Sequence, residues 1–409
     1  MEQKQQSDTV LPLAGIKVLD ISQFVAGPGA AAILADFGAD VIKVEHPVRG
    51  DTWRGYVGKS LYPVKEKNFL FEQDNRNKRA ITLDLTKKAG QQVVHRLIAQ
   101  VDVLITNLRA HELERYDLEY QSLATKNPRL IYGNITGYGL VGPECGKPGF
   151  DYTAYWARAG FQSVLKEPDR PPVMPRSGMG DHVGSLSLAG GISLALYHRE
   201  RTGMGQEVIV SLLNSGMWSL SDDIMAALTQ DMFMPPAPTS ERLAMVNTYR
   251  TKDDKWIMMI HLTPDVYWPA FCKALGLGHL EKDGRFTDYM VRRDNNGVLL
   301  PMVEAAMLSK TSAEWTAIFD EYGLIYSPVQ DPMDLTRDQQ AWATGCYLSM
   351  EHPVHGPFHW VNNPFGLKGT PATIRSAAPE FGQHTEEVLQ EAGLTWEEII
   401  TLKDEGVIA

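Results

Sequence analysis

Residues 16–45 read IKVLDISQFVAGPGAAAILADFGADVIKVE and set the architecture expected of the chain. Two apolar runs, residues 16–21 and 39–45, are typical of buried strands. Between them, Gly27-Pro28-Gly29 opens a helix of small residues from Ala30 to Phe37. A strand, a helix and a second strand in this order form a βαβ unit, which predicts a parallel sheet.

The same alternation continues along the chain. Further strands are expected at 80–85, 103–106, 129–135 and 206–212, with helices at 89–101, 118–126 and 183–201. The fold class is therefore α/β, with a large domain over 10–225 that holds a Rossmann-like parallel sheet. A Pro-rich segment, 234–240, indicates a linker into a smaller α+β domain, 226–330. Residues 331–409 are expected to return to the large domain.

Bulk composition excludes several classes of protein. With 409 residues, 44% of them hydrophobic, and a net charge of -11, the chain resembles neither a general nucleic-acid binder nor a membrane-surface protein. Its three cysteines lie far apart and favour a reducing compartment. The polar N-terminus does not resemble a signal peptide, and the longest apolar stretch, 185–197, is too short to span a bilayer. We expect a cytoplasmic protein.

Asp151 lies between Pro148-Gly149 and the aromatic segment Tyr152-Thr153-Ala154-Tyr155-Trp156. An Asp at such a position is a good helix N-cap. It is also suited to nucleophilic chemistry, because a carboxylate becomes reactive when its hydration shell is removed. A helix N-terminus favours the ionised form that a nucleophile needs, so both interpretations stay open.

Two other patterns suggest ligands. Gly27-Pro28-Gly29-Ala30-Ala31-Ala32 formally matches a dinucleotide fingerprint, with Glu45 as the ribose-binding acid, but residues 22–26 displace the glycines from the strand. An NAD-dependent dehydrogenase is therefore the weaker alternative. The basic run 75–79, with Arg49 and Arg54, suits phosphate groups or forms a solvated loop.

The spacing of His352, His355 and His359, near Cys346, resembles a metal site only superficially. Pro353, Gly356 and Pro357 interrupt the segment, so no helix can align the rings on one face. We predict no metal site.

Taken together, motifs along most of the chain resemble those of the class III CoA-transferases, the family of formyl-CoA transferase and the carnitine and bile-acid CoA-transferases. The strongest are residues 34–45 (LADFGADVIKVE), 75–85 (NRNKRAITLDL), 102–109 (DVLITNLR), 136–139 with 149–151, 201–206 (RTGMGQ), 326–329 and 382–389 (GQHTEEVL).

The resemblance implies that Asp151 is the nucleophile. Its carboxylate would attack an acyl-CoA thioester to give an anhydride, and CoA would then form an aspartyl-CoA thioester before passing to a carboxylic acid acceptor. Residues expected to support the oxyanions are Gly137, Tyr138, Gly139 and Gln23. CoA contacts are implied at Val25, His46, Arg76, Lys78, Asn107, Leu108 and Arg115. The resemblance also implies that CoA is a substrate, that no cofactor is tightly bound, and that the chain forms an interlocked, ring-like homodimer.

The chain also departs from the formyl-CoA transferase pattern. Val25, His46 and Thr136 stand where that enzyme has a glutamine, an arginine and a lysine, and residues 246–252 replace its tetraglycine flap. Together with the aromatic residues after Asp151, these departures favour an aryl or branched 2-hydroxy acid as acceptor.

The 2-methylacyl-CoA racemases share the fold of the class III CoA-transferases, so racemisation is an alternative function. Racemisation needs a base on each side of an acidic carbon. In those enzymes a histidine precedes the matching Asp, and a second Asp matches Asp181. Here Phe150 replaces the histidine, so transfer of CoA is preferred over racemisation.

Overall fold

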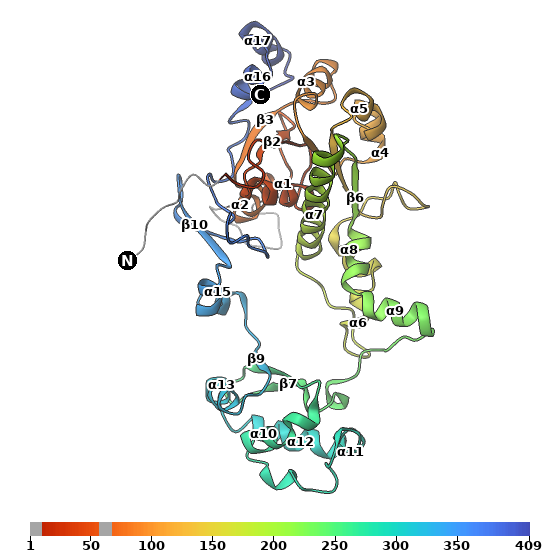
Figure 1. The fold of residues 1–409 in the computed structure, drawn as a ribbon, viewed down its shortest axis with the longest axis vertical. Coiled ribbons are helices and arrows are strands. Elements are labelled where there is room, and N and C mark those ends of the chain that lie inside the picture. The colour runs from red at the N-terminus through yellow and green to blue at the C-terminus, as the bar shows by residue number, and fades with distance from the viewer. Residues whose placement is uncertain (1–9, 57–67) are drawn as a thin grey trace. The chain divides into compact units, whose positions relative to one another are not determined.

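The computed structural model describes residues 10–56 and 68–409, which form two compact units (Figure 1). Unit 1 comprises the described parts of Met1–Ser163, with Val173–Phe233 and Ala343–Ala409. Unit 2 comprises Val164–Pro172 and Met234–Trp342. The domain boundaries expected near residues 226 and 330 thus lie ahead of the changes of unit at 234 and 342.

A six-stranded sheet forms the centre of unit 1, and every neighbouring pair in it is parallel. The strand order is β3-β2-β1-β4-β5-β6, which is the doubly wound order of dinucleotide-binding folds. This confirms the predicted α/β class with a parallel sheet. The strands are β1 (Lys17–Asp20), β2 (Asp40–Glu45), β3 (Lys78–Thr82), β4 (Val103–Thr106), β5 (Ile131–Thr136) and β6 (Glu207–Ser211).

Helices cover both faces of this sheet. One core lies under α1 (Ala26–Asp36) and α7 (Met179–Thr202). The other core lies under α3 (Lys88–Ile98), α4 (Ala110–Tyr116), α5 (Tyr120–Lys126), α16 (Thr385–Glu391) and α17 (Trp396–Asp404). Unit 1 also contains η1 (Arg54–Tyr56), α2 (Phe69–Asn75), η2 (Tyr152–Arg158), α6 (Phe161–Val164, at the boundary), α8 (Leu212–Ser219) and α9 (Ser221–Gln230).

The glycines that resemble a dinucleotide fingerprint lie inside α1 and serve close packing. A Cβ on Gly27 would stand 2.4 Å from the Cβ of Ser22, and one on Gly29 would stand 2.6 Å from the Oγ of Ser185 on α7. The Ser185 hydroxyl also donates to the carbonyl of Ala26, 2.8 Å away. Small residues therefore let α1 and α7 approach each other, and this packing explains the glycines without a phosphate ligand.

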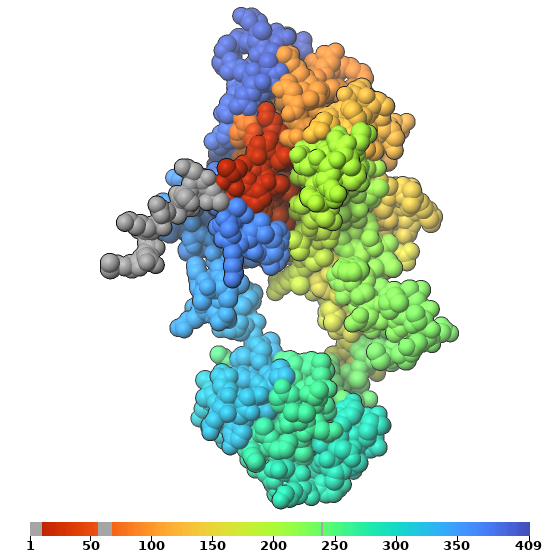
Figure 2. All heavy atoms as spheres, in the orientation of Figure 1, coloured from red at the N-terminus to blue at the C-terminus, as the bar shows by residue number. Residues whose placement is uncertain are grey.

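Residues 343–409 complete unit 1 from the end of the chain. β10 (Tyr347–His352) and β11 (Gly356–Val361) form a hairpin that the prolines of this region did not predict. Farther on, the chain covers the edge of β3, where the Thr82 amide donates to Thr385 Oγ1 at 3.1 Å. Figure 2 shows these C-terminal residues, in dark blue, against the orange segment that contains α3.

Unit 2 joins a small antiparallel sheet to a group of helices around its own core. Its strands are β7 (Val246–Arg250), β8 (Trp256–Ile260) and β9 (Tyr326–Pro328), in the order β7-β8-β9. Its helices are η3 (Thr239–Glu241), α10 (Pro264–Ala274), η4 (Gly278–Leu280), α11 (Tyr289–Asp294), α12 (Asn296–Met307), α13 (Ser312–Glu321) and α14 (Pro332–Leu335), and α15 (Gln339–Ala343) leads back to unit 1.

Candidate active site

Asp151 lies immediately before η2, a π-helix of the kind that often marks a functional site. The residue is 1% exposed, and its side chain makes no capping hydrogen bond to this helix. Instead, its Oδ2 accepts a hydrogen bond of 3.3 Å from the amide of Gly180, in the first turn of α7. This hydrogen bond therefore ties the carboxyl to a segment far away in the sequence rather than to η2.

The electrostatics of Asp151 and Asp181 differ from those of surface carboxyl groups. Burial raises the pKa of Asp151, although the amides of Gly180, Tyr152 and Gly178 partly oppose this rise. Burial first, and the charge of Asp151 second, raise the pKa of Asp181 to about 8. Two carboxyl groups this close do not both ionise readily. At pH 7, Asp181 is therefore a neutral acid that can donate a hydrogen bond.

A cavity of about 210 Å³, here called the switch-point cavity, opens where β1 and β4 end. In this sheet the strand order reverses between these two strands, the place where open α/β folds bind ligands. Gln23 and Asn107 bridge the two loops: the Gln23 amide donates to Asn107 Oδ1 at 3.0 Å, and Asn107 Nδ2 donates to the Gln23 carbonyl at 2.8 Å. The lining includes Gln23, Phe24, Ala26, Asn107, Leu108, Gly137, Phe150 and Asp181.

A second cavity of unit 1, about 710 Å³, is here called the dyad cavity. His182 on α7 and Asp74 on α2 face it, and His182 Nε2 lies 3.1 Å from Asp74 Oδ1. The Asp74 side chain is 4% exposed, whereas that of His182 is 51% exposed. Although burial lowers it, the pKa of His182 is raised overall by the charge of Asp74 and by their hydrogen bond. The buried Asp74 carboxyl therefore orients the His182 ring and favours its charged form.

The two cavities are separated by the same two segments of chain. Phe24 and Ala26 line the switch-point cavity, while Val25 between them lines the dyad cavity. Likewise, Asp181 lines the first cavity and His182 the second. Neighbouring residues thus face opposite ways, and the carboxyl of Asp151 is bound to the amides of one of these segments.

Phe24 has a backbone φ of 66°, a left-handed conformation that is rare for an aromatic residue. Its amide donates to Asp51 Oδ1 at 3.1 Å. Its ring meets the edge of Phe150, with 5.3 Å between centroids, and lies 6.2 Å from Trp53. Strained residues of this kind persist where the surroundings hold them, often at functional sites.

Of the residues predicted to support the oxyanions, only some line the switch-point cavity. Gly137 lines the switch-point cavity. The Gly139 amide, however, donates to Thr136 Oγ1 at 2.9 Å, and the Tyr138 ring lies beneath the ammonium of Lys147, 5.3 Å away. The amides that reach Asp151 belong to Gly180, Tyr152 and Gly178 instead, and two of these lie at the start of α7. The sequence signal for those two is the Ser177-Gly178-Met179-Gly180 turn ahead of a long helix.

The expected CoA contacts divide into two groups. Asn107 and Leu108 line the switch-point cavity, and His46 lines an adjoining cleft of about 80 Å³ that shares Gln23 and Leu108 with it. Val25 faces the dyad cavity. Arg115 is exposed on α4, with its guanidinium 5.9 Å from the centroid of the Tyr116 ring.

Arg76 and Lys78, expected to bind phosphate, are buried in ion pairs. The Arg76 guanidinium lies 2.7 Å from Asp36, and the Lys78 ammonium lies 2.8 Å from Asp20. Lys78 also donates to the carbonyl of Pro28 and to Asn75. Burial lowers the pKa of Lys78 to about 8. These cations hold the loops around α1 together, and their charges are already compensated inside the protein.

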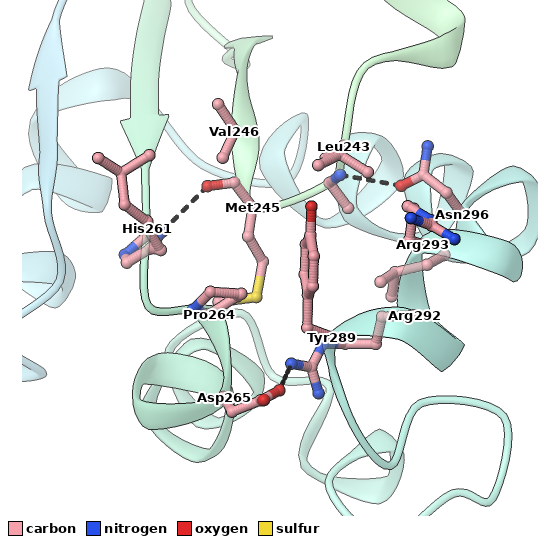
Figure 3. Close-up of a pocket in the computed structure, with 13 residues that line it drawn as sticks. Leu243, Met245, Val246, His261, Pro264, Asp265, Tyr289, Arg292, Arg293 and Asn296 are labelled. Carbon is pink, nitrogen blue, oxygen red and sulfur yellow. Dashed lines mark hydrogen bonds and ion pairs between the residues drawn. The ribbon is translucent and has the colours of Figure 1, made fainter.

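Unit 2 has its own cavity of about 470 Å³, between the sheet and α10, α11 and α12 (Figure 3). Polar side chains around it are bonded within the unit. Arg292 pairs with Asp265, Asn296 accepts from the amide of Ala244 at 2.9 Å, and the His261 ring bonds the Met245 carbonyl. This cavity lacks the closely spaced, shifted carboxyl groups of unit 1, so we place the candidate active site in unit 1.

Among residues 10–56 and 68–409, no group of three or more His, Cys, Asp or Glu side chains is placed to hold a metal ion. His352 bonds Glu72 at 3.2 Å and stacks on His355, while His359 bonds Ser349. Within the same described residues, no helix has the length and apolar character needed to cross a membrane.

Comparison with known proteins gives a consistent result. The sequence profile of CoA-transferase family III matches residues 13–385. The chain is 34% identical to the (R)-2-hydroxy-4-methylpentanoate CoA-transferase of Clostridioides difficile, over 97% of this chain and 99% of that protein. It is also 34% identical to the cinnamoyl-CoA:phenyllactate CoA-transferase of Clostridium sporogenes, over 97% of each. A crystal structure of a CaiB/BaiF family protein from Brucella suis superposes with a TM-score of 0.82 at 28% identity, covering 93% of this chain and 99% of that one.

Proposed function

Because this chain belongs to CoA-transferase family III, we propose that it transfers CoA from an acyl-CoA thioester to a 2-hydroxy carboxylic acid through a covalent intermediate on Asp151. One observation carries the proposal. The Asp151 carboxyl is buried beside Asp181, a neutral acid at pH 7. It bonds the Gly180 amide, in a segment whose Asp181 lines the switch-point cavity and whose His182 lines the dyad cavity. A nucleophile in such a place can meet a substrate from each side while water is excluded.

The first half of the reaction opens the donor thioester. An Asp151 oxygen attacks the thioester carbonyl carbon, the carbon–sulfur bond breaks, and CoA leaves as thiolate while an acyl-aspartyl anhydride forms. The negative charge that enters on Asp151 thus leaves on sulfur. The thiolate then attacks the aspartyl carbonyl, which releases the donor acid as a carboxylate and leaves an aspartyl-CoA thioester. Asp181 supports these steps as a neutral hydrogen-bond donor near the developing oxyanions.

The second half repeats these steps with the acceptor. The acceptor carboxylate attacks the aspartyl thioester, and the thiolate leaves to give a second anhydride. The thiolate then attacks the acyl carbonyl of the acceptor, which frees Asp151 and forms the new acyl-CoA. Each intermediate is destroyed by water, so the burial of Asp151 protects the reaction as well as shaping its pKa.

We assign the switch-point cavity to CoA and the dyad cavity to the acids. Asn107, Leu108 and the adjoining His46 cleft offer a continuous path along the ends of the strands, which suits an extended nucleotide. The dyad cavity has the apolar walls that a branched or aromatic acid requires, including Trp53 and Trp360. Several relatives are named for 2-hydroxy acids: 2-hydroxy-4-methylpentanoate, phenyllactate and citramalate.

Mass spectrometry can test the covalent step. The protein is incubated with a panel of acyl-CoAs, with or without hydroxylamine, and digested. We expect a hydroxamate on the peptide that contains Asp151, formed only with an acyl-CoA that serves as donor. Transfer of CoA without any adduct at Asp151, or transfer retained after Asp151→Ala, would contradict the mechanism. The panel identifies the donor in the same experiment.

Racemisation of a 2-methylacyl-CoA is a second candidate, favoured by one observation. Asp181, a neutral acid at pH 7, lies close enough to Asp151 for each to act on the same substrate carbon as acid and base. The partner expected before Asp151 is missing, because Phe150 has no proton to exchange. Incubation of a 2-methylacyl-CoA in deuterated water, without an acceptor acid, decides between the two. Deuterium at the carbon next to the carbonyl would favour racemisation.

We also propose that the protein acts as a homodimer. Helices α8 and α9 present exposed apolar side chains, with Trp218 81% and Leu228 75% exposed in the single chain. A monomer rarely leaves apolar surface of this kind uncovered. Light scattering on the purified protein should give twice the chain mass, and a monomeric mass at working concentration would exclude the dimer.

A further inference from the structure

We propose that the pair His182–Asp74 binds the 2-hydroxyl group of the acceptor acid, and that it thereby selects 2-hydroxy acids over the same acids without the hydroxyl. This inference rests on the proposed function, since it needs the acid to bind beside Asp151. None of the expectations from the sequence concerned either residue. Their contact joins positions 108 residues apart.

The imidazole is held in one orientation with one nitrogen available. Asp74 Oδ1 lies 3.1 Å from Nε2 of His182. Because the Asp74 side chain is nearly inaccessible, it orients the ring and does not contact a substrate. Within residues 10–56 and 68–409, no protein group bonds the Nδ1 of His182. Half of the side chain is exposed to the dyad cavity, so this nitrogen can bond a ligand.

Nδ1 lies on the side of the ring that adjoins the nucleophile. A Cβ on Gly178 would stand 3.6 Å from Cε1 and 3.8 Å from Nδ1 of His182, so these ring atoms border the glycine. The Gly178 amide in turn lies close enough to act on the Asp151 carboxyl. One residue therefore separates the nucleophile from the imidazole. The hydroxyl of a 2-hydroxy acid is on the carbon next to the carboxyl, so an acid bonded at Asp151 presents its hydroxyl in this direction.

The charge of the pair favours a neutral hydroxyl over an anion. His182 is paired with Asp74, and Arg76, which also lines this cavity, is paired with Asp36, so neither cation is left without a carboxyl partner. A fixed, polarised nitrogen still makes a strong hydrogen bond to a hydroxyl. Around it, Val25, Trp53, Leu70 and Leu186 supply the apolar surface for the rest of the acid.

The test compares pairs of acids that differ only in the hydroxyl, using the full-length protein. For 2-hydroxy-4-methylpentanoate against 4-methylpentanoate, and phenyllactate against 3-phenylpropanoate, kcat/KM is measured with one acyl-CoA donor. The wild type should prefer the hydroxy acid of each pair. His182→Phe keeps a ring but loses the hydrogen bond, and it should lower this preference about 10- to 100-fold. His182→Asn, which keeps an amide near the Nδ1 position, should recover part of it.

Two further variants separate recognition from structure. Asp74→Asn should lower the preference less than His182→Phe, because the ring is still present but is no longer held as an imidazolium. Leu186→Ala, on the wall of the same cavity, should change both acids of a pair alike. A loss of folded protein also lowers both rates alike and leaves their ratio unchanged. An unchanged ratio in His182→Phe, or no preference in the wild type, overturns the inference while CoA transfer stands. Absence of transfer to any acid would overturn the proposed function itself.

Discussion

Unit 1 and unit 2 each contain a cavity large enough for a small organic acid, but their ionisable groups differ in one respect. In unit 2, Arg292 bonds Asp265 and the Phe286 carbonyl and packs over the Trp268 ring. In unit 1, burial raises the pKa of Asp151, and burial together with the charge of Asp151 raises the pKa of Asp181 to about 8. Volume therefore does not locate the chemistry. Ionisable groups with shifted pKa values indicate the reactive site better, because catalytic groups need pKa values matched to their reaction.

Removal of the nucleophile should have the largest effect. Asp151→Asn keeps the size of the side chain but cannot form an anhydride, so CoA transfer should fall by at least about 10⁴-fold. Asp231→Asn is the matched control, since Asp231 lies at an exposed left-handed position that asparagine also accepts. Steady-state rates and circular dichroism measure both. Substantial activity in folded Asp151→Asn protein would remove the distinction between the two units.

The pH dependence of Asp181 sharpens the comparison. Its pKa of about 8 means that the acid is neutral at pH 7 and ionises above pH 8, where a second negative charge would stand beside Asp151. Wild-type transfer should therefore fall about tenfold near pH 9. Asp181→Asn cannot ionise, so its rate should stay level over the same range. A fall of equal size in both proteins would exclude Asp181 as the group responsible.

The same carboxyl links stability to pH. The unfolded chain loses the Asp181 proton near pH 3.8, whereas the folded chain keeps it until about pH 8. Between these values the folded state binds more protons, so this group makes stability fall as the pH rises. Asp181→Asn should unfold at a higher temperature than the wild type at pH 8, and the difference should disappear near pH 4. Thermal unfolding at several pH values measures this, and a constant difference would contradict it.

In unit 2, substitutions should change stability and leave chemistry intact. Arg292→Met loses the bond to the Phe286 carbonyl and the contact with Trp268, which should lower the free energy of unfolding by about 2 kcal/mol. Arg293→Met is the control, because Arg293 pairs only with the exposed Asp294 and should change stability by less than about 0.5 kcal/mol. Denaturant unfolding measures both. A loss of kcat in folded Arg292→Met protein would give this cavity a part in the reaction.

The smallest effect is expected at Tyr289, whose hydroxyl points into the unit 2 cavity (Figure 3). Tyr289→Phe removes only this hydroxyl and should change the free energy of unfolding by less than about 0.5 kcal/mol. CoA transfer should be unchanged. Transfer reduced tenfold at constant stability would show that the cavity binds a substrate.

The sheet of unit 1 was predictable from sequence because apolar runs and glycine turns are local signals. The turn before Asp151 was a local signal too, but it left a helix cap and a nucleophile both open, and only the family resemblance favoured the nucleophile. The hairpin of β10 and β11 was missed because Pro353 and Pro357 indicate turns, yet a two-stranded sheet has only edge strands, which tolerate proline. Arg76 and Lys78 were expected to bind phosphate because spacing does not show that Asp36 and Asp20 lie next to them. His182 was missed for the same reason.

The contacts that hold α2 determine at what point during synthesis the binding site can form. This helix carries Asp74, and its Glu72 is bonded by His352, by the indole of Trp360 and by the amide of Ala378. All three partners leave the ribosome only after the whole of unit 2 has been made. A nascent chain therefore contains Asp151 long before it contains a finished binding site. The contacts that hold α2 are complete only when translation is almost finished.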